Sequence, residues 1–461
     1  MSLRLPPAKV SAFLLLVFLG FGVLVGRATR QPRYALASAR PVVKLISSST
    51  ASVSTTPSTS SEAREPPETE TEAEPTPTQA ATPTKKSAAK SRRGSHGKSN
   101  REGGTGKAAT GAPATKLPAI KHVFVILLSD QPYAAVFGPE SKAHYLAGTL
   151  ERQGELLTRY DAVAHEQLAN GVALLSGQGP TPETAANCAT YTAIEPATIG
   201  ASEQAQGNGC VYPSSTQTLP GQLIAKHLTW RAYVQGIDEA GATAGACAHP
   251  ALGQPDPTSA PNASAGAYAT FRNPLVYFQS LIDTPSCAAD DVGLERLKPK
   301  LGNAARTPSF SLIIPDRCHD GSPTPCTAGA PAGLGPADSF LRQVVPEIIA
   351  SKAYKQGGLI AITVDEAPSS GAFADSSSCC GQPRFPNLAA PSTGLPPRGG
   401  GTVGALLLSP YVKKATTSQE PFNHFSLLRT IEDLFGLGHL GYAALPAVKP
   451  FAPGMFTAAK R

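Results

Sequence analysis

The sequence predicts an α/β fold with a mostly parallel sheet and helices on both faces. Residues 120–128 and 358–364 are predominantly apolar and rich in β-branched side chains, which is typical of strands buried on both sides. Residues 338–351 and 424–435 instead show helical spacing of their apolar side chains. Strands that alternate with helices in this way favour a parallel sheet that is covered on both faces.

The expected elements follow one another from residue 120 onward. Strands are expected at 120–128, 230–234, 309–314, 358–364 and, as the last strand, 404–408. Helices are expected at 140–158, 170–176, 218–226, 338–351 and 424–435. The stretches 236–267 and 367–400 are rich in Gly, Pro and Ser, and we expect them to be loops.

Composition divides the 461 residues into three parts. Residues 1–30 contain an uncharged apolar run at 10–26, which is just long enough to span a bilayer as a helix. Residues 31–117 are dominated by Ser, Thr, Pro, Ala, Glu and Lys, and they bury too little apolar area to offset the entropy of ordering. We therefore expect a membrane segment, a disordered linker and a folded domain at 118–461.

The apolar run at 10–26 has two interpretations. As a signal anchor, it would hold the protein in the cell membrane as a single-pass protein with the bulk of the chain extracytoplasmic. As a signal peptide cleaved later, for example around 35–39, it would release a secreted protein. Positive charge lies on both flanks of the run, so the positive-inside rule does not decide the orientation in the membrane.

The cysteines indicate an oxidising compartment. All of them lie in the folded part, their number is even, and none forms a Cys-x-x-Cys pair, so disulfides are a better interpretation than structural zinc. Adjacent Cys379 and Cys380 are expected to pair with two different partners. The set comprises Cys188, Cys210, Cys247, Cys287, Cys318, Cys326, Cys379 and Cys380.

Charge is distributed unevenly along the chain. Residues 1–117 carry 17 basic and 7 acidic side chains, whereas the rest carries 23 basic and 26 acidic ones. The folded domain is therefore slightly acidic, and no nucleic acid is expected as its partner. The basic part of the linker, 85–107, would be either a solvated spacer or an arm that binds an anionic polymer, lipid headgroups or nucleic acid.

Polar side chains follow the predicted strands at the points where these strands end. Ligand sites of open α/β sheets gather at the carboxyl ends of strands, and carboxylates and imidazoles repeated there indicate a metal-assisted site. A single Asp in such a place is also a common helix cap or turn former. The residues are Asp130 after the first strand, Asp316, His319 and Asp320 after the third, Asp365 and Glu366 after the fourth, and His424 at the start of the last helix.

Several blocks resemble, in order, a bacterial phosphoesterase family of acid phosphatases and phospholipase-C-like enzymes within the alkaline-phosphatase superfamily. They include IKHVFVILL, HEQLANGVALLSG, FRNPLVYF, SFSLIIPDRCHDG, GGLIAITVDEA and FNHFSLLRTIEDLFGL. The resemblance implies an alkaline-phosphatase-like fold in which a divalent metal ion, of identity left open, and a hydroxyl nucleophile hydrolyse a phosphate ester. It also implies a phosphate ester, or another phosphate-bearing ligand, as the partner.

The resemblance assigns roles to five residues of this chain. Asp365 and Glu366 match metal-binding positions of the family, Asp320 matches the aspartate of its Pro-x-x-x-x-Asp block, and His424 matches its late histidine. Asn170 matches an asparagine that is expected to hold a phosphate oxygen.

Four other positions depart from the family pattern. Gln167 stands in place of the nucleophile, and a carboxamide has no ionisable oxygen with which to attack. Ser129 replaces a metal-binding glutamate, Ser322 replaces a histidine, and Arg272 stands where a histidine normally precedes Asn-Pro. These substitutions affect the groups that hydrolysis most needs.

Two neighbouring carboxylates could compensate for the substitutions. Asp130 would replace the missing glutamate as a metal ligand, one position along the chain, and Glu166 would act as a base. Both roles require accurate placement, because a displacement of about 1 Å can reduce a rate greatly.

Three functions remain open from the sequence. The first is a membrane-tethered phosphoesterase with atypical catalytic residues that acts on a small phosphate monoester or a lipid headgroup. The second is a binding module that keeps a phosphate-sized pocket of Asn170, Arg272 and His424 and turns nothing over. The third is a structural surface protein whose tail acts through its charge.

Overall fold

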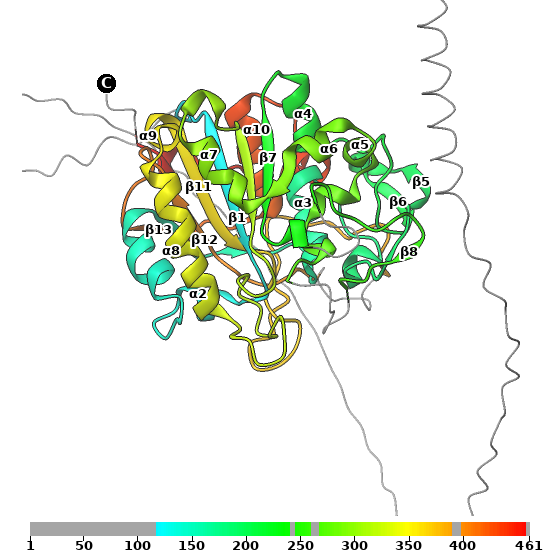
Figure 1. Ribbon diagram of the computed structural model, residues 1–461, viewed down its shortest axis with the longest axis horizontal. Helices are drawn as coiled ribbons and strands as arrows, with labels where there is room; N and C mark the ends of the chain where they lie inside the picture. Colours follow the sequence, from blue (N-terminus) through cyan, green and yellow to red (C-terminus); the bar gives the residue numbers. More distant parts are fainter. Residues whose placement is uncertain (1–116, 240–244, 260–266, 390–397, 458–461) are drawn as a thin grey trace, which may run out of the picture. The chain divides into compact units, whose positions relative to one another are not determined.

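Strand β1 (His122–Leu128) lies near the middle of an eight-stranded sheet in the computed structural model of this protein (Figure 1). The structure describes residues 117–239, 245–259, 267–389 and 398–457. The order of the strands is β13-β2-β12-β11-β1-β10-β7-β9. Besides β1, these are β2 (Glu155–Leu157), β7 (Trp230–Val234), β9 (Asp291–Gly293), β10 (Phe310–Ile314), β11 (Gly358–Val364), β12 (Ala405–Leu408) and β13 (Thr416–Ser418).

The sheet is mostly parallel, as the sequence predicts. β1 pairs in parallel with both β10 and β11, and β7 pairs in parallel with β10 and β9. Only β12 runs antiparallel to its neighbours β11 and β2. The carboxyl ends of β10, β1 and β11 therefore lie side by side at one edge of the sheet.

Helices cover both faces of the sheet. Every residue of β1 and β11 is buried, which requires cover on each side. In Figure 1, α7 and α8 lie in front of the sheet and α10 lies behind it. The α-helices are α2 (Tyr133–Phe137), α3 (Gln167–Ser176), α4 (Leu219–Ala225), α5 (Gln279–Ile282), α6 (Pro285–Asp290), α7 (Leu297–Leu301), α8 (Leu334–Ala350), α9 (Lys352–Gly357) and α10 (His424–Phe435).

Two predicted elements differ from the structure. Residues 140–158 do not form one helix: a π-helix at His144–Leu150 and a 3-10 turn at Glu151–Gln153 lead into strand β2. The two leucines of β2 are compatible with a helix or with a strand, and hydrogen bonding to β12 makes the segment a strand. The expectation that 404–408 is the last strand is also wrong, because β13 and β14 follow it.

Three small sheets lie outside the main one and had no signal in the sequence strong enough to predict them. Their strands are only two to five residues long, too short for a clear alternation. They pair β3 (Tyr160–Asp161) with β14 (Phe422–Asn423), β4 (Thr190–Tyr191) with β8 (Gln254–Pro255), and β5 (Glu195–Ile199) with β6 (Ala205–Asn208).

The prediction of disulfides is confirmed. The bridges are Cys188–Cys210, Cys247–Cys287, Cys318–Cys326 and Cys379–Cys380. The expectation that Cys379 and Cys380 pair with two different partners is wrong, because these neighbours are bonded to each other.

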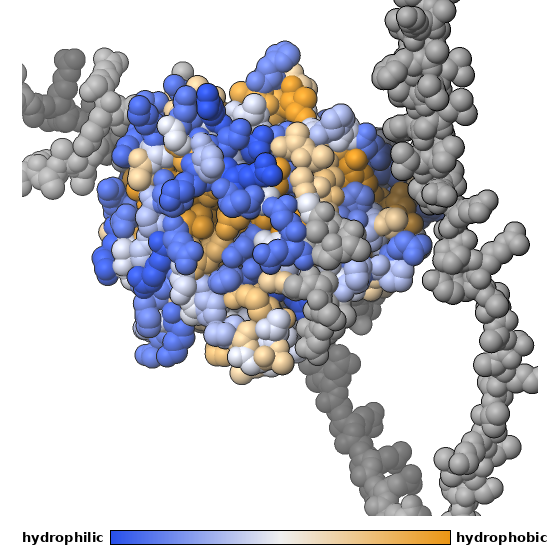
Figure 2. All heavy atoms as spheres, in the orientation of Figure 1, coloured by the Kyte–Doolittle hydropathy of each residue, from blue (hydrophilic) through white to orange (hydrophobic). Residues whose placement is uncertain are grey.

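The predicted membrane segment at 10–26 and the linker at 31–117 lie outside the described residues, apart from Leu117. Within the part of the chain that the structure describes, no helix is long and apolar enough to cross a bilayer. The face of the folded domain in Figure 2 is mainly hydrophilic, with apolar residues gathered over α4, where Ile224 is 47% exposed.

Candidate functional site

The strand ends of the sheet bring together the carboxylates that the sequence singles out. Asp320 follows β10 and Asp365 follows β11, so the two side chains flank the end of β1. The backbone ties the three ends together: the Ser129 N–H donates to the Asp320 carbonyl at 2.8 Å, and the Asp365 N–H donates to the Leu128 carbonyl at 2.9 Å. Asp320, Asp365 and Glu366 are all buried. We call Asp320, Asp365, Glu366, Arg272 and His424 the floor of the site.

Arg272 lies between the two aspartates of the floor. Its Nη1 is 3.1 Å from Asp320 Oδ2 and 3.5 Å from Asp365 Oδ2, and its Nη2 donates to the Leu127 carbonyl at 3.3 Å. The side chains of these three charged residues are only 2–3% exposed. A buried guanidinium needs such partners, since an unpaired charge in this environment would be very costly.

His424, the first residue of α10, is fixed as a neutral ring. Its Nε2 lies 3.0 Å from the Asp365 carbonyl oxygen, which can only accept, so Nε2 carries the proton. Nδ1 then accepts from the Tyr160 hydroxyl at 2.9 Å. Burial lowers the pKa of His424 to about 4, which keeps the ring uncharged near neutral pH.

The N-terminus of α3 forms the rim of the site, together with Asp130. Gln167, the first residue of the helix, donates from Nε2 to Ser129 Oγ at 2.8 Å. Its Oε1 accepts from Asn187 Nδ2 at 3.2 Å, and the same Asn187 group donates to Glu166 Oε2 at 2.6 Å. The two substituted positions of the family pattern, Ser129 and Gln167, therefore bond to each other.

The side chain of Asn170, in the first turns of α3, forms all its hydrogen bonds with backbone groups of the segment just before the helix. Its Oδ1 accepts the N–H groups of Val163 and Ala164, and its Nδ2 donates to the carbonyls of Ala164 and Glu166. These four bonds fill the capacity of a carboxamide. The contact of Asn170 with a phosphate oxygen stays a prediction, and such a contact would require one of these bonds to break.

The half-buried carboxylates Asp130 and Glu166 line the rim, and both have left-handed backbones with φ of 49° and 74°. Burial, followed by the charges of Asp320 and Glu166, raises the pKa of Asp130 to about 6. Burial also raises the pKa of Glu166. Their backbone N–H groups point inward, where Asp130 donates to Asp365 Oδ1 and Glu166 donates to Glu366 Oε2.

The floor and rim carry more acid than base. Burial raises the pKa of Asp320, and raises those of Asp365 and Glu366 well above the usual range. Repulsion by Glu366 adds to the effect on Asp365, and repulsion by Glu166 adds to the effect on Glu366. Arg272 opposes the rise at all three carboxylates. A cationic group is therefore the element that this cluster most requires.

A divalent metal ion is the cation that the family implies, but the side chains as placed do not fit one. Arg272 already stands between Asp320 and Asp365, and one oxygen each of Asp365 and Glu366 is taken by a backbone N–H. The oxygens of Asp320 and Asp365 thus face a nitrogen at hydrogen-bond distance, rather than converging on an ion at the 2.0–2.6 Å typical of metal–oxygen bonds.

Within the described residues, the one group that brings three potential donor atoms within 4.8 Å of one another lies outside the floor and comprises Cys247, Cys287 and Asp291. Both sulfurs of this group are joined in a disulfide, and only a thiolate is an effective ligand. This cluster is therefore not a metal site either.

Sequence reasoning missed two residues that organise the site. Asn187 links Glu166 to Gln167, and its Oδ1 also accepts the Leu168 N–H at the start of α3. The Tyr160 hydroxyl donates to Nδ1 of His424. Neither lies next to a recognisable motif, so only the fold reveals them. Two residues that the sequence singled out, Asp316 and His319, bond to each other at 2.7 Å, and Ser322 donates its N–H to Asp320 Oδ1.

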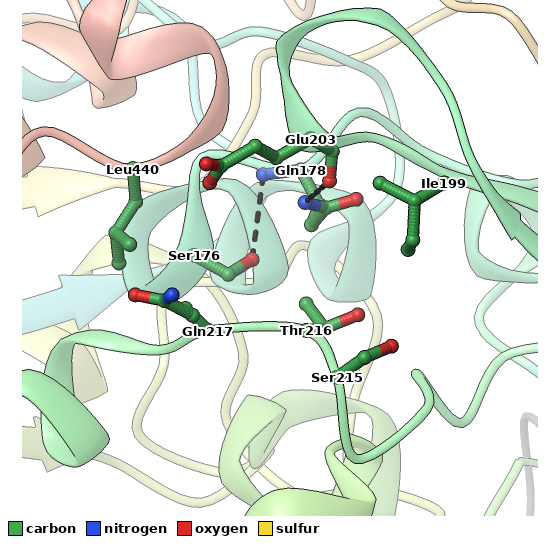
Figure 3. A pocket seen from close by; sticks show the side chains of 8 residues that line it. All are labelled: Ser176, Gln178, Ile199, Glu203, Ser215, Thr216, Gln217 and Leu440. Carbon is green, nitrogen blue, oxygen red and sulfur yellow. Dashed lines mark hydrogen bonds between the residues drawn. The ribbon is translucent and has the colours of Figure 1, made fainter.

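A pocket lies at the other end of α3, next to Ser176 (Figure 3). Its volume is about 190 Å³, and Gln178, Glu203, Thr216 and Leu440 are among the residues that line it. The Gln178 carboxamide is used internally, by the Glu203 carbonyl and the Ala205 N–H. This pocket has no cluster of titratable groups, so the strand ends are the better candidate site.

The fold and site define a class: an α/β protein with acidic residues at the carboxyl ends of the parallel strands of a mostly parallel sheet. A sequence profile described as the Phosphoesterase family matches residues 120–438. The chain belongs to the Phosphoesterase family, and the resemblance seen in its sequence is confirmed.

Solved structures similar to this chain share little sequence with it. One is an alkaline phosphatase superfamily protein from Vibrio parahaemolyticus, with 13% identity, a TM-score of 0.41 and coverage of 74% of this chain and 73% of the other. Another is a lipoteichoic acid synthase from Listeria monocytogenes, with 10% identity, a TM-score of 0.40 and coverage of 76% and 80%. Murine ectonucleotide pyrophosphatase/phosphodiesterase 5, in an inactive form with AMP, has 10% identity, a TM-score of 0.41 and coverage of 73% and 100%. No curated protein matches the chain.

Proposed function

We propose that this protein is a phosphoesterase-fold binding module, held on the outer side of the cell membrane, which does not hydrolyse phosphate esters. The observation that carries the proposal is the bond between Gln167 Nε2 and Ser129 Oγ. A carboxamide stands in the nucleophile's place, and the Ser129 hydroxyl to which it donates is fully buried. Gln167 and Ser129 therefore offer no free hydroxyl for a phosphoryl-enzyme intermediate at the position that the family uses.

The exposed part of the site favours a ligand that donates hydrogen bonds. The rim offers the carboxylates of Asp130 and Glu166, which accept hydrogen bonds when ionised. Arg272, the group best suited to a phosphate, is occupied by two aspartates. A hydroxyl- or amine-bearing ligand fits this rim better than a bare phosphate does, and a phosphate-bearing ligand would bind through its alcohol part.

A second candidate is hydrolysis by an atypical route. The specific observation in its favour is Glu166, whose half-buried carboxylate has a raised pKa and lies beside Asp130. Such a group suits a general base that activates water. Under this hypothesis, a water molecule activated by Glu166 attacks the phosphorus in place of the hydroxyl nucleophile of the family.

One assay separates the two candidates. The full-length protein is incubated with p-nitrophenyl phosphate and bis-p-nitrophenyl phosphate across pH, with and without divalent metals. The binding module predicts no turnover above that of the Asp365→Ala variant. Turnover that disappears in Glu166→Gln but survives in the matched amide variant Glu203→Gln would establish the hydrolase instead.

Binding is tested by calorimetric titration with glucosamine, which carries hydroxyls and an ammonium group, and with inorganic phosphate. We expect saturable binding of glucosamine that is lost in Glu166→Gln, and none of phosphate. Saturable binding of phosphate alone would contradict the assignment of the rim.

The placement outside the membrane is supported by the apolar run at 10–26 and by the four disulfides. It predicts that protease added to intact spheroplasts digests the protein.

A further inference from the structure

We infer that Arg272 is a built-in cation that replaces the metal ion of this site, so that the folded domain is complete without any metal. The inference concerns what neutralises the floor and does not depend on the proposed function. It follows from the position of one side chain relative to three neighbouring strands.

The Arg272 guanidinium contacts groups at the ends of three neighbouring strands. β10 and β11 flank β1, and Arg272 contacts all three ends: Asp320 after β10, the Leu127 carbonyl of β1, and Asp365 after β11. An ordinary ion pair joins one carboxylate to one cation. Here a single Nη1 lies between carboxylates from two separate strands, as a bridging cation does.

The backbone holds Arg272 in this place. It ends a 3-10 turn at Thr270–Arg272, and the next residue, Asn273, donates from Nδ2 to Asp291 Oδ2 at 2.7 Å on strand β9. The Thr270 N–H donates to Thr258 Oγ1 at 2.8 Å. Hydrogen bonds of Thr270 and Asn273 thus hold the turn on both sides of Arg272.

The contacts of the guanidinium also show what sets its position. Its Nε is buried and has no hydrogen-bond partner among the described residues, while Nη1 and Nη2 face oxygens. The side chain leaves one donor unsatisfied in order to place its charge between Asp320 and Asp365. An arginine keeps its charge at all pH values that a protein tolerates, so this cation cannot be removed as a metal can.

Metal content of the untagged full-length protein tests the inference directly. The protein is purified from medium with Zn²⁺, Mn²⁺ and Ca²⁺, incubated again with each ion, and analysed by inductively coupled plasma mass spectrometry. We expect far less than one ion per chain and a melting temperature that EDTA leaves unchanged, because a site without a bound ion gains nothing from one. About one ion per chain, together with a melting temperature lowered by EDTA, would overturn the inference.

The variant Arg272→His removes the internal cation and places a potential ligand beside Asp320 and Asp365. We expect its metal content to rise roughly ten-fold or more over wild type, and its melting temperature to become sensitive to EDTA. Arg231→His is the matched control, since Arg231 pairs with Asp290 at 3.3 Å away from the site, and should gain no metal. A folded Arg272→His protein that stays free of metal would also contradict the inference. If this variant does not fold, Arg272→Lys keeps a cation and should fold without metal, and a metal in it would count against the inference.

Discussion

The floor and the rim of the site differ in how they depart from the family pattern. The floor keeps the acidic residues and the histidine and changes the cation, with Arg272 between Asp320 and Asp365. At the rim, neutral side chains stand at the nucleophile position and at one metal-ligand position, and these two residues, Gln167 and Ser129, are bonded to each other. The difference teaches that the carboxylates left in the floor keep a charged partner, because an unpaired buried charge is costly, whereas Ser129 and Gln167 at the rim satisfy each other through a neutral hydrogen bond.

Removal of the floor's cation should have the largest effect. In Arg272→Leu, two buried carboxylates lose their partner, and we expect a loss of about 3–5 kcal/mol in the free energy of unfolding at pH 8, measured by urea denaturation. Arg231→Leu, which breaks a more exposed pair, should cost at most about 1 kcal/mol. Equal losses in the two variants would mean that the floor is not a dry ionic centre.

Acid should weaken the floor through His424. Its folded pKa of about 4 lies below the unfolded value of 6.5, so the unfolded chain binds more protons between these pH values. The stability due to the neutral ring is complete above pH 6.5 and declines as the pH falls toward 4. Relative to His424→Gln, the wild type should lose about 2–3 kcal/mol between pH 7 and pH 4.5.

The amide of glutamine can still accept from Tyr160 and donate to the Asp365 carbonyl, which makes His424→Gln a matched variant without a titrating ring. The measurement is the difference in urea midpoints at the two pH values. Parallel pH profiles of the two proteins would show that the ring does not titrate in this range.

At the rim, Asn170 is the residue whose loss should cost most. Asn170→Ala leaves the N–H groups of Val163 and Ala164 without their acceptor in a buried loop, and we expect about 2 kcal/mol of destabilisation. Asn170→Asp keeps the acceptor oxygen and should retain the bonds to these N–H groups. If the aspartate variant were the weaker of the two in urea denaturation at pH 5, the acceptor contacts would not be what Asn170 provides.

Much of the floor could be predicted from the sequence because its signals are local. The apolar runs at 120–128 and 358–364 form β1 and β11, and the carboxylates that follow them in the chain lie at the same edge of the sheet. A strand end and the residue after it are fixed by chain continuity alone. The family pattern then assigns which strand ends matter.

The contacts that distinguish this site could not be predicted in the same way. Arg272 and Asp365 are 93 positions apart, and the substitution of a histidine by arginine does not say which carboxylates the new side chain meets. Asn187 and Tyr160 act through long-range hydrogen bonds without any motif. The backbone bonds of the Asn170 amide had no signal in the sequence either, and its contact with a phosphate oxygen stays a prediction.

Restoring a hydroxyl at the rim should change least. Gln167→Ser loses the bonds to Ser129 and Asn187 at a half-buried position, so we expect a cost of about 1 kcal/mol or less in the free energy of unfolding. We also expect no turnover of p-nitrophenyl phosphate, because the neutralised floor offers no group that would activate the new hydroxyl. Gln217→Ser, at an exposed position away from the strand ends, is the matched control. Turnover by Gln167→Ser alone would show that the floor still supports catalysis and that only the rim separates this chain from an active phosphoesterase.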